Sequence, residues 1–261
     1  MNPLEELPNE VEHLLHTLAG QELWGPFTTY TPFIFIVMIL VLAIVFAAKR
    51  NLSEVPNNRF TGVIEFFVDF TTNDIGYSMI GPTAKKHMPF LLTIFIFILV
   101  ANLVGIIPGS KSIGGTMGIT VALAVVSFVY FTYCGIKQHG VGKYIMSYAP
   151  HGVKPAPLAG FVWLLEMFSM VLRLLTLSVR LFANMFAGHI LLGVLALLTS
   201  LFVTPLIQTM SIEALPTAAI SIAWVVLLTA LYALEVFVAV IQAYVFTLLS
   251  SAYVMLATTD H

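Results

Sequence analysis

The chain has 261 residues, of which 59% are hydrophobic and only 9% are charged, and its formal net charge is −2. An ordinary soluble domain is about one quarter charged, so this composition excludes a soluble protein and predicts an all-α integral membrane protein. The sequence has no basic run of the kind that binds nucleic acid. Its single cysteine, Cys134, provides neither a disulfide framework nor a zinc site, and we expect no metal and no cofactor.

The first 25 residues are expected to form a polar arm ahead of one membrane domain over residues 26–261. The arm contains five glutamates and neither lysine nor arginine, whereas a secretory signal begins with a basic segment. We therefore expect neither a secretory signal nor a transit peptide, and we expect a short helix over Glu10–Leu18.

Three apolar segments come near the 20 or so residues that a membrane-spanning helix needs. Basic pairs mark the end of the first and the start of the second, and lysines follow the third. We predict three spans roughly perpendicular to the membrane plane, over Phe33–Ala48, Met88–Pro108 and Met117–Ile136.

Residues 60–80 have a different pattern. Glu65, Asp69 and Asn73 recur at four-residue steps on one helical face. This pattern predicts an amphipathic helix that lies in the membrane interface, with a solvated connecting helix as the alternative. The apolar residues of the other face are Val63, Phe66, Phe67 and Phe70.

Two apolar stretches, over 157–203 and 214–257, are each more than 40 residues long. A helix of that length extends roughly 60 Å at about 1.5 Å per residue, about twice the ~30 Å hydrocarbon core. Neither stretch contains a polar hairpin loop, which favours two long tilted helices joined as a hairpin near Thr204–Ser211. An ordinary bundle of six or seven helices is the alternative.

The basic residues predict an orientation, because lysine and arginine are enriched in cytoplasmic loops. With the acidic arm outside, Lys111 alone is outside and Arg173 and Arg180 lie within an apolar stretch. The remaining basic residues are all inside: Lys49, Arg50, Arg59, Lys85, Lys86, Lys137, Lys143 and Lys154.

The long stretches carry polar residues at membrane depth, where charges are costly and are functional candidates by default. One stripe with helical spacing runs from the inside end of the first stretch to its middle. It consists of Glu166, Ser169, Arg173, Thr176, Arg180 and Asn184. His189 is about 180° round the helix from Arg180 at 100° per residue, and Glu235 and Gln242 share a face of the last stretch.

These residues suggest two partial proton routes, a file from Glu166 to Thr176 open to the inside and a His189–Glu235 pair reached from outside. Glutamate and histidine exchange protons near neutral pH when their surroundings shift them. Arg180 lies between the routes and stays protonated, so it can act as a barrier to direct leakage.

Structural alternatives remain open for several of these residues. Arg180 could pair with Glu166 or Glu235 and lock helices together, and Arg173 could extend to the inside interface. His189 could be a satisfied core histidine. Asn102 could form a helix–helix hydrogen bond or line the outer route, whereas Tyr232, Tyr244, Gly188 and Gly193 are expected to serve helix packing.

Two segments carry a family resemblance. Ser178–His189 (SVRLFANMFAGH) and Ile241–Leu249 (IQAYVFTLL) are similar to the signature of subunit a of the F-type ATP synthase. The resemblance extends more weakly from about Asn58 to the end of the chain.

The resemblance implies a stator subunit of the membrane-embedded Fo motor that is not an enzyme on its own. In this family Arg180 matches the essential arginine, which faces the ring of c subunits and separates two offset half-channels. The inner half-channel would use Glu166, Ser169 and Thr176, with Asn184 and Arg173 in support. The outer half-channel would use His189, Glu235, Asn102 and Gln242.

The expected partners are the c-ring, the peripheral-stalk subunit b, the rest of the F1Fo ATP synthase and the lipid bilayer. The expected location is a bacterial plasma membrane, with the mitochondrial inner membrane as the alternative. A self-contained secondary transporter or ion channel is the competing function, although the sequence shows no convincing internal repeat of the kind such folds contain. An intramembrane enzyme is less favoured, because neither H-E-x-x-H nor G-x-S-x-G occurs.

Overall fold

The structure is a computed structural model that describes residues 22–24, 27–50, 59–107, 109–147, 156–209 and 215–259. Its described part is helical except for one short antiparallel ribbon, β1 (Glu22–Trp24) with β2 (Phe27–Thr28). Within this described part, four helices are long and apolar enough to cross a membrane. The prediction of an all-α membrane protein is thus confirmed, whereas the expected arm helix over Glu10–Leu18 lies outside the described residues.

The three expected spans appear as α2 (Thr31–Arg50), α5 (Met88–Ile106) and α6 (Met117–His139). In α2 the apolar stretch within the described residues, Thr31–Ala47, is shorter than in the four spanning candidates. Helix α5 is central, since it contacts α2, α9 and η1. The perpendicular orientation of α2, α5 and α6 in a bilayer stays a prediction.

The segment over residues 60–80 is helical but not one regular α-helix. It consists of α3 (Arg59–Asp69), the π-helical η1 (Phe70–Tyr77) and α4 (Ser78–Ile80). Asn73 Nδ2 donates to Asp69 Oδ1 at 2.5 Å, which confirms that these two residues share a face. The wider turns of η1 were not predicted, and they place the buried Gly76 against Met88, where a Cβ would overlap the Met88 side chain.

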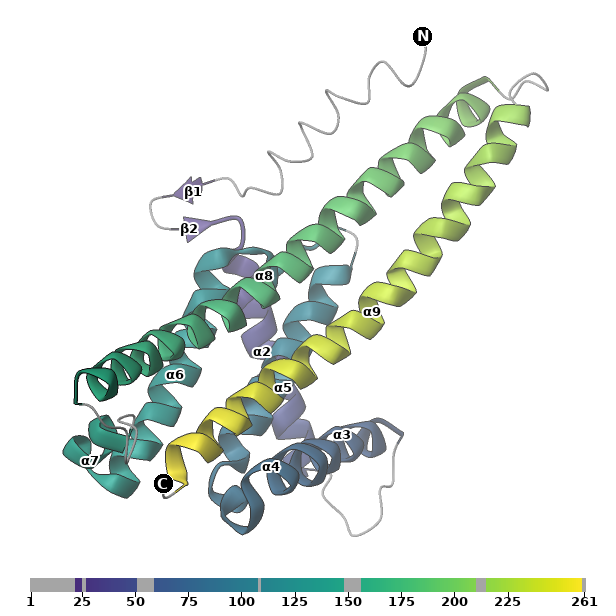
Figure 1. Cartoon of the computed structure of the whole chain (residues 1–261). Helices are drawn as coiled ribbons and strands as arrows, with labels where there is room; N and C mark the ends of the chain where they lie inside the picture. Colours follow the sequence, from purple (N-terminus) through teal and green to yellow (C-terminus); the bar gives the residue numbers. More distant parts are fainter. Residues whose placement is uncertain are drawn as a thin grey trace.

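The expected apolar face of this segment is divided between two environments. The rings of Phe67 and Phe70 pack against Phe95 of α5, whereas Val63 and Phe66 are exposed. Figure 1 shows α3 and α4 lying beside the C-terminal part of α9. Location in the membrane interface stays a prediction that this exposed apolar pair supports.

The two long stretches are continuous helices, α8 (Ala156–Thr209, 54 residues) and α9 (Leu215–Thr258, 44 residues). They form a hairpin that crosses α5 and α6 diagonally (Figure 1). This confirms long single helices over two pairs of spans. The turn was predicted too early, because α8 continues to Thr209; the apolar run through residue 207 sustains the helix beyond the expected start of the turn.

Helix α6 holds the hairpin through small and hydroxylated side chains. Ser178 of α8 donates to Thr120 at 3.3 Å, and the hydroxyls of Ser127 and Ser250 of α9 are 2.8 Å apart. Such bonds typically contribute about 1 kcal/mol between membrane helices. They help to hold α8 and α9 against α6.

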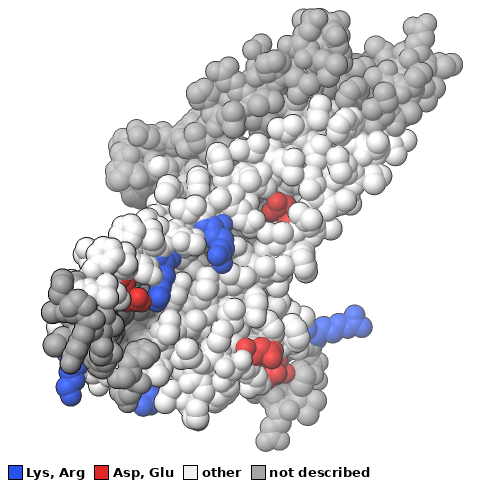
Figure 2. Space-filling view, in the orientation of Figure 1, with Lys and Arg blue, Asp and Glu red and all other residues white. Residues whose placement is uncertain are grey.

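Basic residues gather at one end of the structure. Lys85 and Lys86 end η2 (Gly81–Lys86), Lys137 is in the last turn of α6, and Lys143 is in α7 (Val141–Ser147). Lys111 lies at the opposite end, where its Nζ donates to Thr29 Oγ1 at 3.2 Å. On the face in Figure 2, charged groups are few within a largely uncharged surface. The separation agrees with the predicted orientation, and the compartment on each side stays a prediction.

Candidate functional site

The candidate site lies where α8 and α9 run antiparallel across the end of α5. Gly188 of α8 is opposite Glu235 of α9. One turn further in, Met185 and Ala239 belong to one buried cluster with Ile106 of α5. Three helices therefore meet around Glu235, and the α5 and α9 residues that contribute are more than 100 positions apart in the sequence.

Glu235 is only 6% exposed, and its carboxyl group occupies space that a side chain at Gly188 would fill. A Cβ at Gly188 would lie 2.6 Å from Glu235 Cδ and 2.7 Å from Oε2, and closer still to Oε1. Ordinary carbon contacts are about 3.5–4.0 Å. Gly188 therefore lets the carboxyl group lie against the backbone of α8, next in sequence to His189.

Asn102 of α5 connects this site to the centre of the bundle. It is 1% exposed, and its Nδ2 donates to the carbonyl oxygen of Ala239 at 3.5 Å. The helix–helix bond considered from the sequence is therefore present. The other end of the carboxamide, Oδ1, faces Gly114, where a Cβ would lie 3.4 Å away.

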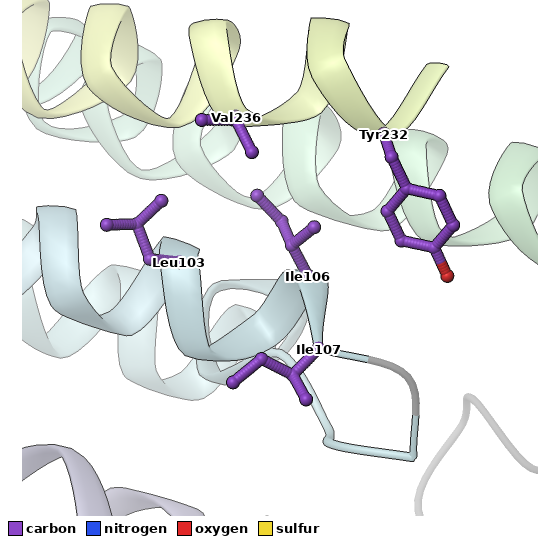
Figure 3. Close-up of a pocket in the computed structure, with 5 residues that line it drawn as sticks. All are labelled: Leu103, Ile106, Ile107, Tyr232 and Val236. Carbon is purple, nitrogen blue, oxygen red and sulfur yellow. The ribbon is translucent and has the colours of Figure 1, made fainter. Parts of the chain in front are cut away.

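His189 lines a pocket of about 270 Å³ at the end of α5 nearest Lys111. Its walls also include Gly105, Ser110, Gly193 and Tyr232. A more apolar pocket of about 440 Å³ adjoins it, formed by Leu103, Ile106, Ile107, Tyr232 and Val236 (Figure 3). Tyr232 of α9 lines both pockets, as do Ile106 and Ile107.

Five polar atoms in this region are buried without a hydrogen-bond partner among the described residues. An unmade buried hydrogen bond costs about 1–3 kcal/mol, and native proteins typically satisfy such groups with ordered water. These atoms lie between the His189 pocket and the turn of α8 that contains Arg180. They are His189 Nε2, Glu235 Oε2, Ser112 Oγ, Asn102 Oδ1 and Asn184 Nδ2.

Gln242 continues this path along α9. It is 6% exposed and lies two turns after Glu235 on the same face. The adjacent Ala243 shares the largest core cluster with Leu181 of α8. Gln242 and Glu235 are thus buried on one face of α9, as the seven-residue spacing predicted.

Arg180 has an exposed side chain on α8, whereas the neighbouring Leu177 and Leu181 are buried. The described residues include no ion pair to Arg180, so pairing with Glu166 or Glu235 is not seen. Its surroundings on the surface include exposed apolar side chains such as Leu175 and Val179. An unpaired cation in such a setting at membrane depth is costly.

The inner part of the predicted stripe is partly engaged in structural contacts. Arg173 pairs with Glu166 at 3.4 Å, and its guanidinium lies 5.6 Å from the centre of the Tyr253 ring. Arg173 therefore bridges α8 and α9 rather than extending freely toward the interface. Ser169 is half-buried, and Thr176 is exposed with its hydroxyl bonded to the carbonyl of Leu172 at 2.8 Å.

Sequence reasoning missed three members of the site. Gly188 and Tyr232 were assigned to packing, and Ser112 carried no signal because it lies in the connection between α5 and α6. The sequence did offer one signal for Gly188, namely its position directly before His189. Tyr244, by contrast, packs as expected, with its ring 5.5 Å from that of Phe70. Among the described residues no cluster of three or more His, Cys, Asp or Glu could hold a metal ion.

The fold and this arrangement define a largely helical polytopic membrane protein with buried polar groups between its longest helices. The sequence model of the family described as ATP synthase A chain matches residues 31–255. The chain is 33% identical over 253 residues to ATP synthase subunit a of Wolbachia sp. subsp. Drosophila simulans, covering 97% of both chains. It is 34% identical over 227 residues to that of Beijerinckia indica, covering 87% of this chain and 85% of the relative.

A third relative, ATP synthase subunit a 2 of Chlorobaculum tepidum, is 34% identical over 258 residues, covering 94% of this chain and 67% of the relative. The family match extends over most of the sequence and includes every residue of the candidate site. The chain belongs to the ATP synthase subunit a family.

Proposed function

We propose that this chain is the stator subunit of the Fo motor, which guides protons to and from a rotating c-ring. It performs no chemical catalysis itself, and couples proton flow to ring rotation and ATP synthesis. The observation that carries the proposal is Arg180, an exposed cation with no ion-pair partner among the described residues, on a helix apolar enough to span a membrane. A carboxylate on a neighbouring subunit would compensate that charge.

The outer half-channel would begin at the His189 pocket and continue through Glu235. The close approach allowed by Gly188 holds the carboxyl group of Glu235 beside α8. Asn102 and Gln242 extend the polar path toward Arg180. The buried, unpartnered atoms of His189, Glu235 and Asn102 support a hydrated route, because water is their natural partner.

The inner half-channel would use Glu166, Ser169 and Thr176 at the basic end of the structure. The Arg173–Glu166 pair means that Glu166 acts within an ion pair, so Arg173 would tune and orient it. Asn184 would support the region around Arg180, one turn away on α8.

Arg180 would separate the two routes electrostatically. A ring carboxylate gains from the cation when it is ionised, and a neutral carboxylic acid gains much less. A carrier that arrives protonated therefore releases its proton to the inner route before it passes the arginine. Once past the arginine, the carrier is protonated again from the outer route. It then makes nearly a full turn with the ring before it releases that proton to the inner route.

The family places the chain in the F1Fo ATP synthase, and we propose contacts with the c-ring and with the peripheral-stalk subunit b. The spanning helices make it a membrane protein. Its bacterial relatives support the bacterial plasma membrane as the location. We also propose that residues 26–261 act as one channel domain preceded by the arm over residues 1–25.

The test is Arg180→Ala in the assembled complex, with Arg59→Ala as the control for loss of an exposed arginine. We expect Arg180→Ala to abolish proton-driven ATP synthesis while the complex still assembles, and Arg59→Ala to retain synthesis. Normal synthesis with Arg180→Ala would overturn the proposal. Ion transport by the purified chain in vesicles without a c-ring would instead favour a self-contained transporter.

A further inference from the structure

We propose that the Ser112 hydroxyl is a hydrogen-bonding station for water and protons in the outer half-channel. The inference rests on the proposed function and adds a residue from the connection between α5 and α6. That connection contains the short helix η3 (Ile113–Gly115).

The connection folds back into the protein instead of passing over its surface. Ser112 and Ile113 are each 1% exposed, and Gly114 is buried as well. Gly105 of α5 makes this possible, since a Cβ there would lie 2.8 Å from both Cβ and Oγ of Ser112. The Ser112 hydroxyl is therefore held against the backbone of α5.

The surroundings of Ser112 join the two ends of the outer path. Gly105, which Ser112 touches, also lines the His189 pocket. Two residues further along the connection, Gly114 lies against Oδ1 of Asn102 and against Met185 of α8. Ser112 thus contacts the wall of the pocket, and two residues later the same connection contacts the buried carboxamide of Asn102.

The hydroxyl of Ser112 has no hydrogen-bond partner among the described residues, although it is almost completely buried. Ser127 is equally buried at 1% exposure, but its hydroxyl is paired with that of Ser250 at 2.8 Å. Ser110 is nearby in sequence, and its hydroxyl donates to backbone carbonyls at the end of α5, including that of Ile107 at 2.7 Å. Ser112 is the serine of this connection whose hydroxyl remains available to water.

A serine hydroxyl suits this position because it donates one hydrogen bond and accepts others without carrying charge. It can hold a water molecule in either orientation, so a proton can move along the water file in both directions of the motor. No bond in the side chain is broken, and the proton continues toward Glu235.

The experiment uses the complete ATP synthase reconstituted in vesicles with F1 facing outward, in a Cys134→Ser background. Proton flow through Fo is measured after removal of F1. Ser112→Ala should assemble normally, since it leaves no protein partner unpaired, and should slow proton flow about fivefold, as expected for loss of one ordinary hydrogen bond. Ser127→Ala is the matched control and should leave the rate unchanged.

A second variant tests whether water reaches the site. Ser112→Cys keeps the shape of the side chain, and Ag⁺ enclosed in the vesicle lumen, the outer side, should block most of its proton flow. Ser127→Cys should be insensitive to Ag⁺ from either side. This readout separates a station in the channel from a residue that only supports packing.

The proposal is overturned if Ser112→Cys is insensitive to luminal Ag⁺, or if it reacts only from the F1 side. A normal rate in Ser112→Ala would also overturn it. If Arg180→Ala still abolishes synthesis in these cases, the stator function stands and only the role of Ser112 fails. If Ser112→Ala does not assemble, the Ag⁺ result for Ser112→Cys decides.

Discussion

Replacing Gly188 with alanine tests how the site positions Glu235. The added Cβ would lie 2.6 Å from Glu235 Cδ, against an ordinary contact of 3.4 Å or more, so the carboxyl group must move by at least 0.8 Å (3.4 − 2.6). The far end of a glutamate side chain can rotate away, so the cost in folding should be at the lower end of the ~1–3 kcal/mol typical of overpacking. The main effect should be a displaced carboxyl group.

We expect Gly188→Ala to assemble and to slow proton-driven ATP synthesis about tenfold, since a misplacement of about 1 Å in a reacting group can cost up to ~100-fold. The assay compares synthesis and passive proton flow in reconstituted vesicles. Gly160→Ala is the matched control, because Gly160 also lies on α8 and a Cβ there meets nothing within 4 Å. It should leave both rates unchanged.

A second substitution should reverse the defect. Glu235→Asp shortens the side chain by one carbon–carbon bond, about 1.5 Å, and so makes room for the alanine methyl group. Gly188→Ala with Glu235→Asp should therefore be more active than Gly188→Ala alone. Normal synthesis in Gly188→Ala, or no recovery in the double variant, would refute the positioning argument.

Two further predictions follow from contacts at the basic end and along the polar path. His189→Ala combined with Glu235→Ala should slow proton uptake from outside far more than Arg173→Ala, because the Arg173–Glu166 pair is half-exposed and such pairs contribute little; equal effects on proton flow would contradict the route. Burial, and then the neighbouring Lys86, lowers the pKa of His87, whose Nδ1 lies 3.0 Å from the Tyr130 hydroxyl. A histidine in the unfolded chain has a pKa of about 6.5, so below that pH the unfolded state binds more protons at position 87 than the folded state does. The contribution of His87 to folding stability is therefore complete above about pH 6.5 and is lost as the pH falls. His87→Asn should reduce the drop in the thermal midpoint of the complex between pH 7.5 and 5.5. An unchanged drop would contradict the role of His87 in the pH dependence of stability.

Much of the fold was predictable because the membrane imposes simple limits on sequence. Apolar length identified α5, α6, α8 and α9, and the absence of polar turn residues predicted that α8 and α9 are unbroken. The π-helical segment η1 was not predictable, since it accompanies a tertiary contact between Gly76 and Met88 that a pattern of hydrophobicity does not record.

The candidate site was predictable in part. Arg180, His189 and Glu235 were conspicuous because charged and titratable residues are rare in apolar helices. Their spacing correctly predicted that Gln242 shares a face with Glu235. Arg173 was ambiguous from sequence, and the structure shows it bridging Glu166 and Tyr253.

The sequence by itself determined which residues are polar within the apolar helices, where the basic residues lie along the chain and that two helices are too long for a perpendicular span. Only the tertiary structure decided which of those residues meet. It brought Glu235 against Gly188, Asn102 against Ala239 and Ser112 against Gly105. These contacts join separate helices at a register fixed by side-chain packing, and a one-dimensional pattern of hydrophobicity carries no measure of that register.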